Sequence, residues 1–121
     1  MGRILVIGRG VSGQAALKLA GALGMEAVAA SDAELGNADL DSWFDRVDLV
    51  VTSPGVGENS RLLREAVARG IAVASELQFG ADHFAGRIVA VTGTNGKTTT
   101  VELTTHLLRE LGVPARYAGN I

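Results

Sequence analysis

A glycine-rich loop at residues 93–98 most constrains how this chain can fold. The loop reads Gly93-Thr94-Asn95-Gly96-Lys97-Thr98 and follows an apolar run at residues 87–91 that predicts a buried strand. Beyond the loop, apolar residues recur three or four positions apart over residues 101–111, which predicts a helix. A strand, a glycine-rich turn and a helix in this order are typical of a phosphate-binding loop.

The chemistry of such a loop follows from its residue types. Glycines let backbone N–H groups turn toward a phosphate, and the start of a helix adds partial positive charge. Lys97 can then bind the β- and γ-phosphates, and the Thr98 hydroxyl can ligate Mg²⁺. The strict pattern would require a glycine at Val91, so the loop is tighter than usual. A glycine-rich turn with a solvated lysine is the alternative interpretation.

A second glycine-rich turn lies near the start of the chain. The apolar run at residues 4–7 ends in Gly8-Arg9-Gly10-Val11-Ser12-Gly13. A helical pattern at residues 15–23 and an apolar run at residues 27–30 follow, and Asp32 stands about twenty positions after the glycines. This is the G-x-G-x-x-G fingerprint in a strand–helix–strand setting, and it predicts a nucleotide-type ligand.

Each glycine of this turn has an expected role. Gly8 would allow the tight turn, Gly10 would let a pyrophosphate approach the backbone, and Gly13 would let the helix lie close to the strand. Asp32 stands where a ribose or a base would be hydrogen-bonded.

Two more apolar runs, residues 48–52 and 71–74, predict a third and a fourth strand. Ser53-Pro54-Gly55 follows the third strand, at the end where open α/β sheets place ligand contacts. An ordinary strand-to-helix turn is the alternative there. Between the strands lie helical patterns with Asn59 or Ser60, and Ser75, as N-cap candidates. The repeated strand–helix order predicts an α/β fold with a doubly wound, mainly parallel, Rossmann-like sheet.

The best domain boundary is Ala85-Gly86. Residues 1–86 would form the first domain, and residues 87–121 the opening strand, phosphate loop and helix of a second α/β domain, with one more strand at residues 115–118. The net charge of −2 gives no reason to expect nucleic acid, and the absence of cysteine excludes disulfides and thiolate metal sites. No signal peptide and no membrane-length apolar run is visible, so a cytoplasmic protein without a membrane partner is expected.

Two phosphate-binding signatures in succession are more specific than either one alone. The chain resembles the N-terminal part of the Mur ligases, and the resemblance is carried by residues 8–13, Asp32, residues 53–55, residues 92–99 and the terminal Gly119-Asn120-Ile121. Within that family, residues 53–55 and the doubly wound first domain favour the member that adds D-glutamate. The alanine-adding member is the nearest alternative.

The resemblance implies an ATP-dependent amide ligase of peptidoglycan synthesis. Its partners would be UDP-N-acetylmuramoyl-L-alanine and D-glutamate, and its cofactors ATP and Mg²⁺. The substrate carboxylate would be phosphorylated to an acyl phosphate, and the amine of the incoming amino acid would displace the phosphate. Residues 1–86 would bind the UDP-substrate, and residues 87–121 would begin the ATP-binding central domain.

The resemblance also assigns roles to residues. Val11 and Ser12, with Gly8, Gly10 and Gly13, would contact the diphosphate, and Asp32 would contact the uridine. Ser53, Pro54 and Gly55 would line the substrate groove, and Asn120 would contact the muramoyl portion. ATP would be bound by Gly93, Thr94, Asn95, Gly96, Lys97, Thr98 and Thr99, with Lys97 and Thr98 as catalytic residues and Thr98 as the metal ligand. Ala33 departs from the polar residues that help to hold uracil in the family.

Later acidic metal ligands, a later lysine and the amino-acid domain of the family have no counterpart in this chain. We therefore expect a fragment that binds nucleotide without ligating. The uncovered faces of its second part would be covered by the first domain or, through self-association, by another copy of the chain. Two other classes stay open at this point. One is a free-standing dinucleotide module that binds NAD, and the other is a P-loop GTPase or kinase, which the missing glycine at Val91 disfavours.

Overall fold

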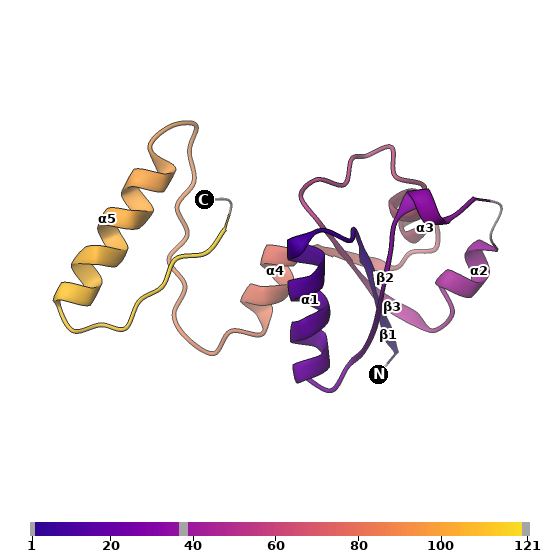
Figure 1. Ribbon diagram of the computed structural model, residues 1–121, viewed down its shortest axis with the longest axis horizontal. Helices are drawn as coiled ribbons and strands as arrows, with labels where there is room; N and C mark the ends of the chain where they lie inside the picture. The colour runs from indigo at the N-terminus through magenta and orange to yellow at the C-terminus, as the bar shows by residue number, and fades with distance from the viewer. Residues whose placement is uncertain (1, 37–38, 120–121) are drawn as a thin grey trace. The chain divides into compact units, whose positions relative to one another are not determined.

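The computed structural model describes residues 2–36 and 39–119 (Figure 1). The chain divides into two compact units, Met1–Phe84 and Ala85–Ile121. The assignment of residues 1–86 to a UDP-substrate and of residues 87–121 to ATP stays a prediction.

The first unit is built on a four-stranded sheet. Its strands are β1 (Arg3–Ile7), β2 (Glu26–Ala30), β3 (Val47–Thr52) and β4 (Ala72–Ser75), in the order β2-β1-β3-β4. All neighbouring strands are parallel, and Leu5 of β1 pairs with both Val28 and Val50. The predicted α/β fold with a parallel, Rossmann-like sheet is therefore confirmed.

Helices cover both faces of this sheet. They are α1 (Val11–Ala22), α2 (Leu40–Trp43), α3 (Arg61–Ala68) and α4 (Glu76–Asp82), with a short 3₁₀ turn, η1, at Asp32–Glu34. None of the helices in the described part of the chain combines the length and the apolar character needed to cross a bilayer.

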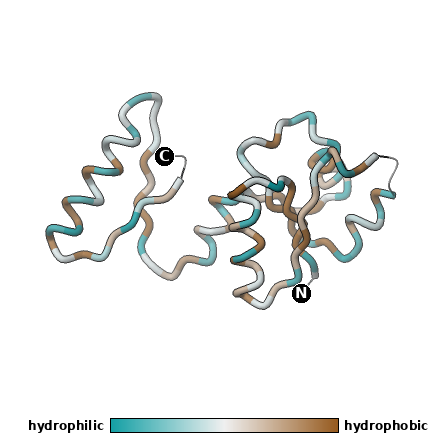
Figure 2. The backbone as a smooth tube through the Cα atoms, viewed as in Figure 1, coloured by the Kyte–Doolittle hydropathy of each residue, from teal (hydrophilic) through white to brown (hydrophobic). Residues whose placement is uncertain are grey.

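The core has one layer on each face of the sheet, because successive side chains of β1 point to opposite faces. Leu5 and Ile7 pack on one face with Phe44 and with Leu62 of α3, and Trp43 lies half-buried against the same cluster. Ile4 and Val6 pack on the other face with Ala16 of α1 and Phe79 of α4. The strands accordingly stand out among the hydrophobic stretches of the chain in Figure 2.

The strand order reverses at β1. From β1 the chain moves outward to β2, then returns to the other side of β1 for β3 and moves outward again to β4. In open α/β sheets the carboxyl ends of the strands form a crevice at such a reversal. Here the loops that follow β1 and β3 flank it.

Three helices of the first unit begin at a residue whose side chain caps them. The Asp39 carboxylate accepts from the N–H of Asp41 at 3.0 Å, Ser60 Oγ accepts from Leu63 at 3.2 Å, and Ser75 Oγ accepts from Gln78 at 3.1 Å. The caps predicted at Ser60 and Ser75 are confirmed. Each cap satisfies one backbone N–H that the helix itself leaves open.

The second unit contains the helix α5 (Lys97–Glu110) but neither predicted strand. Residues 87–91 and 115–118 are coil, so both strand predictions are wrong for this structure. A β-strand needs a neighbour to pair its backbone groups, and the described part of the second unit contains no other strand. Ile88 and Val89 are accordingly 57% and 74% exposed rather than buried.

Gly13 allows a direct stability test, because a Cβ at this position would lie 2.3 Å from the carbonyl oxygen of Gly8. We expect Gly13→Ala to lower the free energy of unfolding by about 1–3 kcal/mol, the usual cost of overpacking. Gly21→Ala is the matched control, since Gly21 lies in the same helix and has no atom within 4 Å of an added Cβ. That variant should be neutral or slightly stabilising. Urea unfolding followed by circular dichroism measures both, and equal midpoints would contradict the packing argument.

Candidate functional site

The turn after β1 lies in contact with the loop after β3. Gly8 has a φ of +117°, and its N–H donates to the carbonyl oxygen of Ala30 at 2.9 Å. A Cβ on Gly8 would lie 2.7 Å from Ser53 Oγ, so a glycine is required both by the backbone angle and by the close approach of Ser53. Gly13 also permits a close contact. The sequence predicted that it would let the helix approach the strand, but its neighbour is the carbonyl oxygen of Gly8, in the turn itself.

The helix that follows this turn begins without a side-chain cap. Gly10 is the N-cap residue of α1, and the first hydrogen bond within the helix joins the N–H of Gln14 to Gly10 O at 3.1 Å. The preceding N–H groups, including those of Val11 and Ser12, face the end of the helix, where partial positive charge accumulates. Val11 is 91% exposed, although it is apolar. This helix start is suited to an anion.

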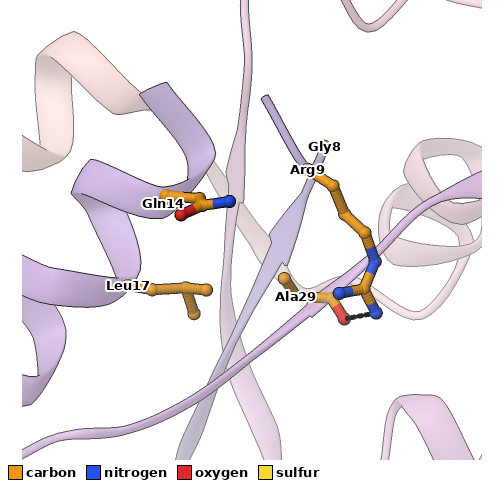
Figure 3. Close-up of a pocket in the computed structure, with 5 residues that line it drawn as sticks. All are labelled: Gly8, Arg9, Gln14, Leu17 and Ala29. Carbon is orange, nitrogen blue, oxygen red and sulfur yellow. Dashed lines mark hydrogen bonds between the residues drawn. The ribbon is translucent and has the colours of Figure 1, made fainter. Parts of the chain in front are cut away.

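Two cavities adjoin Gly8. One, of about 390 Å³, is lined by Gly8, Arg9, Gln14, Leu17 and Ala29, and Figure 3 shows Gln14 and Leu17 on α1 facing Ala29 of β2. The other, of about 480 Å³, is lined on its polar side by Ser31, Asp32, Asn59, Ser60 and Arg61, with Gly8 and Gly55. Residues from three parts of the sequence, Gly8, Asp32 and Gly55, therefore share one cavity at the carboxyl end of the sheet.

Arg9 extends from the turn across the end of β2. Its guanidinium forms a two-pronged ion pair with Glu34 of η1 and donates to the carbonyl oxygen of Ala29 at 3.1 Å (Figure 3 shows the contact to Ala29). The hydrogen bonds from Arg9 lower the pKa of Glu34 from its ordinary value, and Ser31 adds to the shift. The pair fixes the direction of the Arg9 side chain and connects the glycine turn to η1.

Asp32 has a structural partner that the sequence did not indicate. Its Oδ1 accepts a hydrogen bond from the N–H of Leu62 at 3.0 Å, so it caps α3 together with Ser60. The carboxylate also lines the larger cavity. Asp32 thus connects η1 to the start of α3, and its predicted contact with uridine stays a prediction.

The loop after β3 is fixed from both sides. The N–H of Ser53 donates to Ile7 O at 3.2 Å, and the N–H of Val56 donates to Ser53 O at 3.1 Å. The Ser53 hydroxyl donates to Glu76 of α4 at 2.5 Å. Pro54 and Gly55 are exposed at the tip of this turn. Hydrogen bonds to β1 and to α4 therefore hold this loop, and the predicted ligand contacts of residues 53–55 stay a prediction.

The glycine loop of the second unit, like the first, ends at a glycine that begins a helix without a side-chain cap. Gly93 and Gly96 have φ angles of +148° and +78°, and Gly96 is the N-cap residue of α5. The helical hydrogen bonds begin with the N–H of Thr100 donating to Gly96 O at 2.9 Å. Lys97 and Thr98 are the first two residues of α5, and both are exposed. Thr94, Asn95 and Thr99 are exposed as well.

The structure thus brings part of the predicted set together. Gly8, Gly10, Val11, Ser12, Gly13, Asp32, Ser53, Pro54 and Gly55 lie at the carboxyl end of the first sheet, whereas residues 93–99 belong to the second unit, and Asn120 lies outside the described residues. Sequence reasoning missed Arg9, Glu34 and Glu76. Glu76 could have been found, because it directly follows β4 and so lies at the same edge of the sheet as Ser53.

The Asp32 cap gives a prediction. Asp32→Ala should lower the free energy of unfolding by about 1 kcal/mol, because the N–H of Leu62 loses its acceptor. Asp32→Asn keeps an oxygen in place and should lose less. Asp45→Ala is the control, since that carboxylate is 66% exposed and pairs only weakly with Arg46 at 3.7 Å. An Asp32→Ala chain as stable in urea as the unsubstituted one would show that Asp32 does not hold α3.

Comparison with known proteins gives relatives that include several D-glutamate ligases. The chain is 42% identical over 136 residues to the UDP-N-acetylmuramoylalanine–D-glutamate ligase of Rubrobacter xylanophilus, which covers 99% of this chain and 31% of the relative. It is 38% identical over 122 residues to the ligase of the same name from Aquifex aeolicus, covering 98% of this chain and 28% of that protein. The corresponding protein of Solibacter usitatus is 46% identical over 78 residues, 64% of this chain and 18% of the relative.

No family model matches the chain. It spans about a third or less of the length of these curated relatives, 18% to 31%. The chain is therefore similar, over nearly its whole length, to part of the D-glutamate-adding Mur ligases, and the predicted family resemblance is confirmed.

Proposed function

We propose that this chain is part of an ATP-dependent ligase that adds D-glutamate to UDP-N-acetylmuramoyl-L-alanine in peptidoglycan synthesis, through an acyl phosphate. The observation that carries the proposal is the similarity, over 98% to 99% of the chain, to relatives named as UDP-N-acetylmuramoylalanine–D-glutamate ligases. The two open helix starts support it, since each begins at a glycine and is suited to a phosphate.

The first unit would hold the UDP portion of the substrate. The turn at residues 8–13 would take the diphosphate on the N–H groups of Val11 and Ser12, because they lie at the open start of α1. Asp32 and its cavity would take the uridine, and residues 53–55 would line the rest of the substrate. Asn120 would contact the muramoyl portion.

The second unit would hold ATP and Mg²⁺. The residues present fit such a ligand, since Gly93 and Gly96 give the loop its left-handed turns and the start of α5 carries no acidic residue. Lys97 would neutralise phosphate charge, and the Thr98 hydroxyl would ligate the metal ion. In the described part of the chain no three His, Cys, Asp or Glu side chains gather to hold a metal.

The alternatives are weaker. A free-standing NAD module has no use for a second glycine loop, and the relatives with nearly full coverage of the chain carry the D-glutamate name rather than an alanine-adding one. A cytoplasmic location without nucleic acid or membrane partners completes the proposal. Exposed apolar side chains in the second unit, such as Val89 at 74% and Leu111 at 79%, are where self-association would occur.

Calorimetric titration with UDP-N-acetylmuramoyl-L-alanine tests the substrate assignment. We expect binding by the unsubstituted chain, none with NAD, and loss of binding in Gly10→Val, because the side chain would fill the place of the diphosphate. Gly10 has an ordinary φ of −74° and no atom within 4 Å of an added Cβ, so the variant should fold. If Gly10→Val binds as tightly as the parent, the diphosphate lies elsewhere.

A phosphate-release assay tests the activity of the chain by itself. With ATP, Mg²⁺, UDP-N-acetylmuramoyl-L-alanine and D-glutamate, the 121 residues are expected to give no turnover, because phosphoryl transfer needs more metal ligands and positioned groups than Lys97 and Thr98 supply. A longer chain that includes the remaining length of the relatives is the positive control. Turnover by the 121 residues, abolished in Lys97→Ala, would show that the proposed dependence on further segments is wrong.

A further inference from the structure

The contact between Ser53 and Glu76 links two loops of the crevice. β3 and β4 are paired with Thr52 opposite Ser75. Ser53 and Glu76, which directly follow these two strands, are therefore neighbours at the carboxyl end of the sheet. Ser53 Oγ donates its hydrogen to Glu76 Oε1 at 2.5 Å. A carboxylate oxygen can only accept, so the direction of this bond is fixed.

The surroundings hold both side chains in place. A Cβ on Gly8 would lie 2.7 Å from Ser53 Oγ, and one on Gly13 would lie 3.7 Å from Glu76 Oε1. Glu76 is also the first residue of α4, which Ser75 caps. Gly8 thus leaves room for the Ser53 hydroxyl, and the position of Gly13 lies within ordinary van der Waals distance of Glu76, so the pair lies directly against the turn.

A serine hydroxyl has one hydrogen to donate and two lone pairs. Because the hydrogen is given to Glu76, the side chain of Ser53 can offer a ligand only an acceptor. We propose that Glu76 is a positioning residue that makes Ser53 an acceptor for an N–H or O–H group of the UDP-substrate, and not a donor to its phosphates. This inference rests on the proposed function and adds the chemical class of the group that Ser53 recognises.

Electrostatics alone gives the opposite expectation. The UDP-substrate carries negative charge on its diphosphate, so a nearby carboxylate repels it and its removal would strengthen binding. A positioning role predicts weaker binding instead, because the freed Ser53 hydroxyl can rotate and present its hydrogen. The sign of the change in affinity therefore separates the two roles.

The experiment is a double-mutant cycle on the affinity for UDP-N-acetylmuramoyl-L-alanine, measured by calorimetry. Glu76→Ala should weaken binding about three- to tenfold, the value of one neutral hydrogen bond. Glu76→Gln keeps an oxygen acceptor and should stay within about twofold of the parent. In a Ser53→Ala background, Glu76→Ala should have no further effect, because the group through which it acts is gone. Glu110→Ala, at the end of α5, controls for loss of a surface carboxylate.

Circular dichroism and the unfolding midpoint are measured for each variant, so that a folding defect in Glu76→Ala is recognised. If Glu76→Ala is misfolded, the affinities of Glu76→Gln and Ser53→Ala are compared instead. Equal or tighter binding by Glu76→Ala, or losses that add in the double variant, would overturn the inference while leaving the proposed function intact. Absence of binding by the unsubstituted chain would overturn the proposed function and the inference with it.

Discussion

The close approach of Gly8 and Gly13 is the constraint on which the rest of the first unit depends. A Cβ at Gly13 would come within 2.3 Å of the Gly8 carbonyl, so the chain can leave β1 and enter α1 within a few residues only because both positions lack side chains. The tight turn places the start of α1 directly above the end of β1, beside the reversal in strand order. Ser53 and Glu76 then reach the same edge from β3 and β4.

The helix starts of the protein fall into two kinds. In α2, α3 and α4 a side chain of Asp39, Ser60 or Ser75 satisfies one backbone N–H of the first turn. In α1 and α5 the N-cap residue is a glycine, and no acidic residue lies in the first turn. These two uncapped starts follow the two glycine loops that the sequence analysis identified. The side-chain cap that satisfies a backbone N–H in the other helices is therefore absent at the two helix starts where a phosphate would bind.

The sequence was sufficient for features set by local pattern. Apolar runs and turn residues predicted the positions of the four strands, the glycine turn and the Ser60 and Ser75 caps, because each is written in residues a few positions apart. The parallel pairing was predicted from the repeated strand–helix order. The sequence was insufficient where a partner lies far along the chain. Residues 87–91 have the composition of a strand, but the described part of the second unit contains no strand to pair with them. Asp32 accepts a hydrogen bond from Leu62, thirty positions later. Glu76 accepts one from Ser53, and only the register of β3 and β4 brings these two residues together.

The placement of the aromatic residues has a practical consequence. The chain contains one tryptophan and one tyrosine. Trp43 lies half-buried against the core of the first unit, and Tyr117, 46% exposed, lies in the second. Each unit thus carries its own intrinsic chromophore, and selective excitation of the indole reports on the first unit alone. The folding of the first unit can therefore be followed without a label and without cutting the chain.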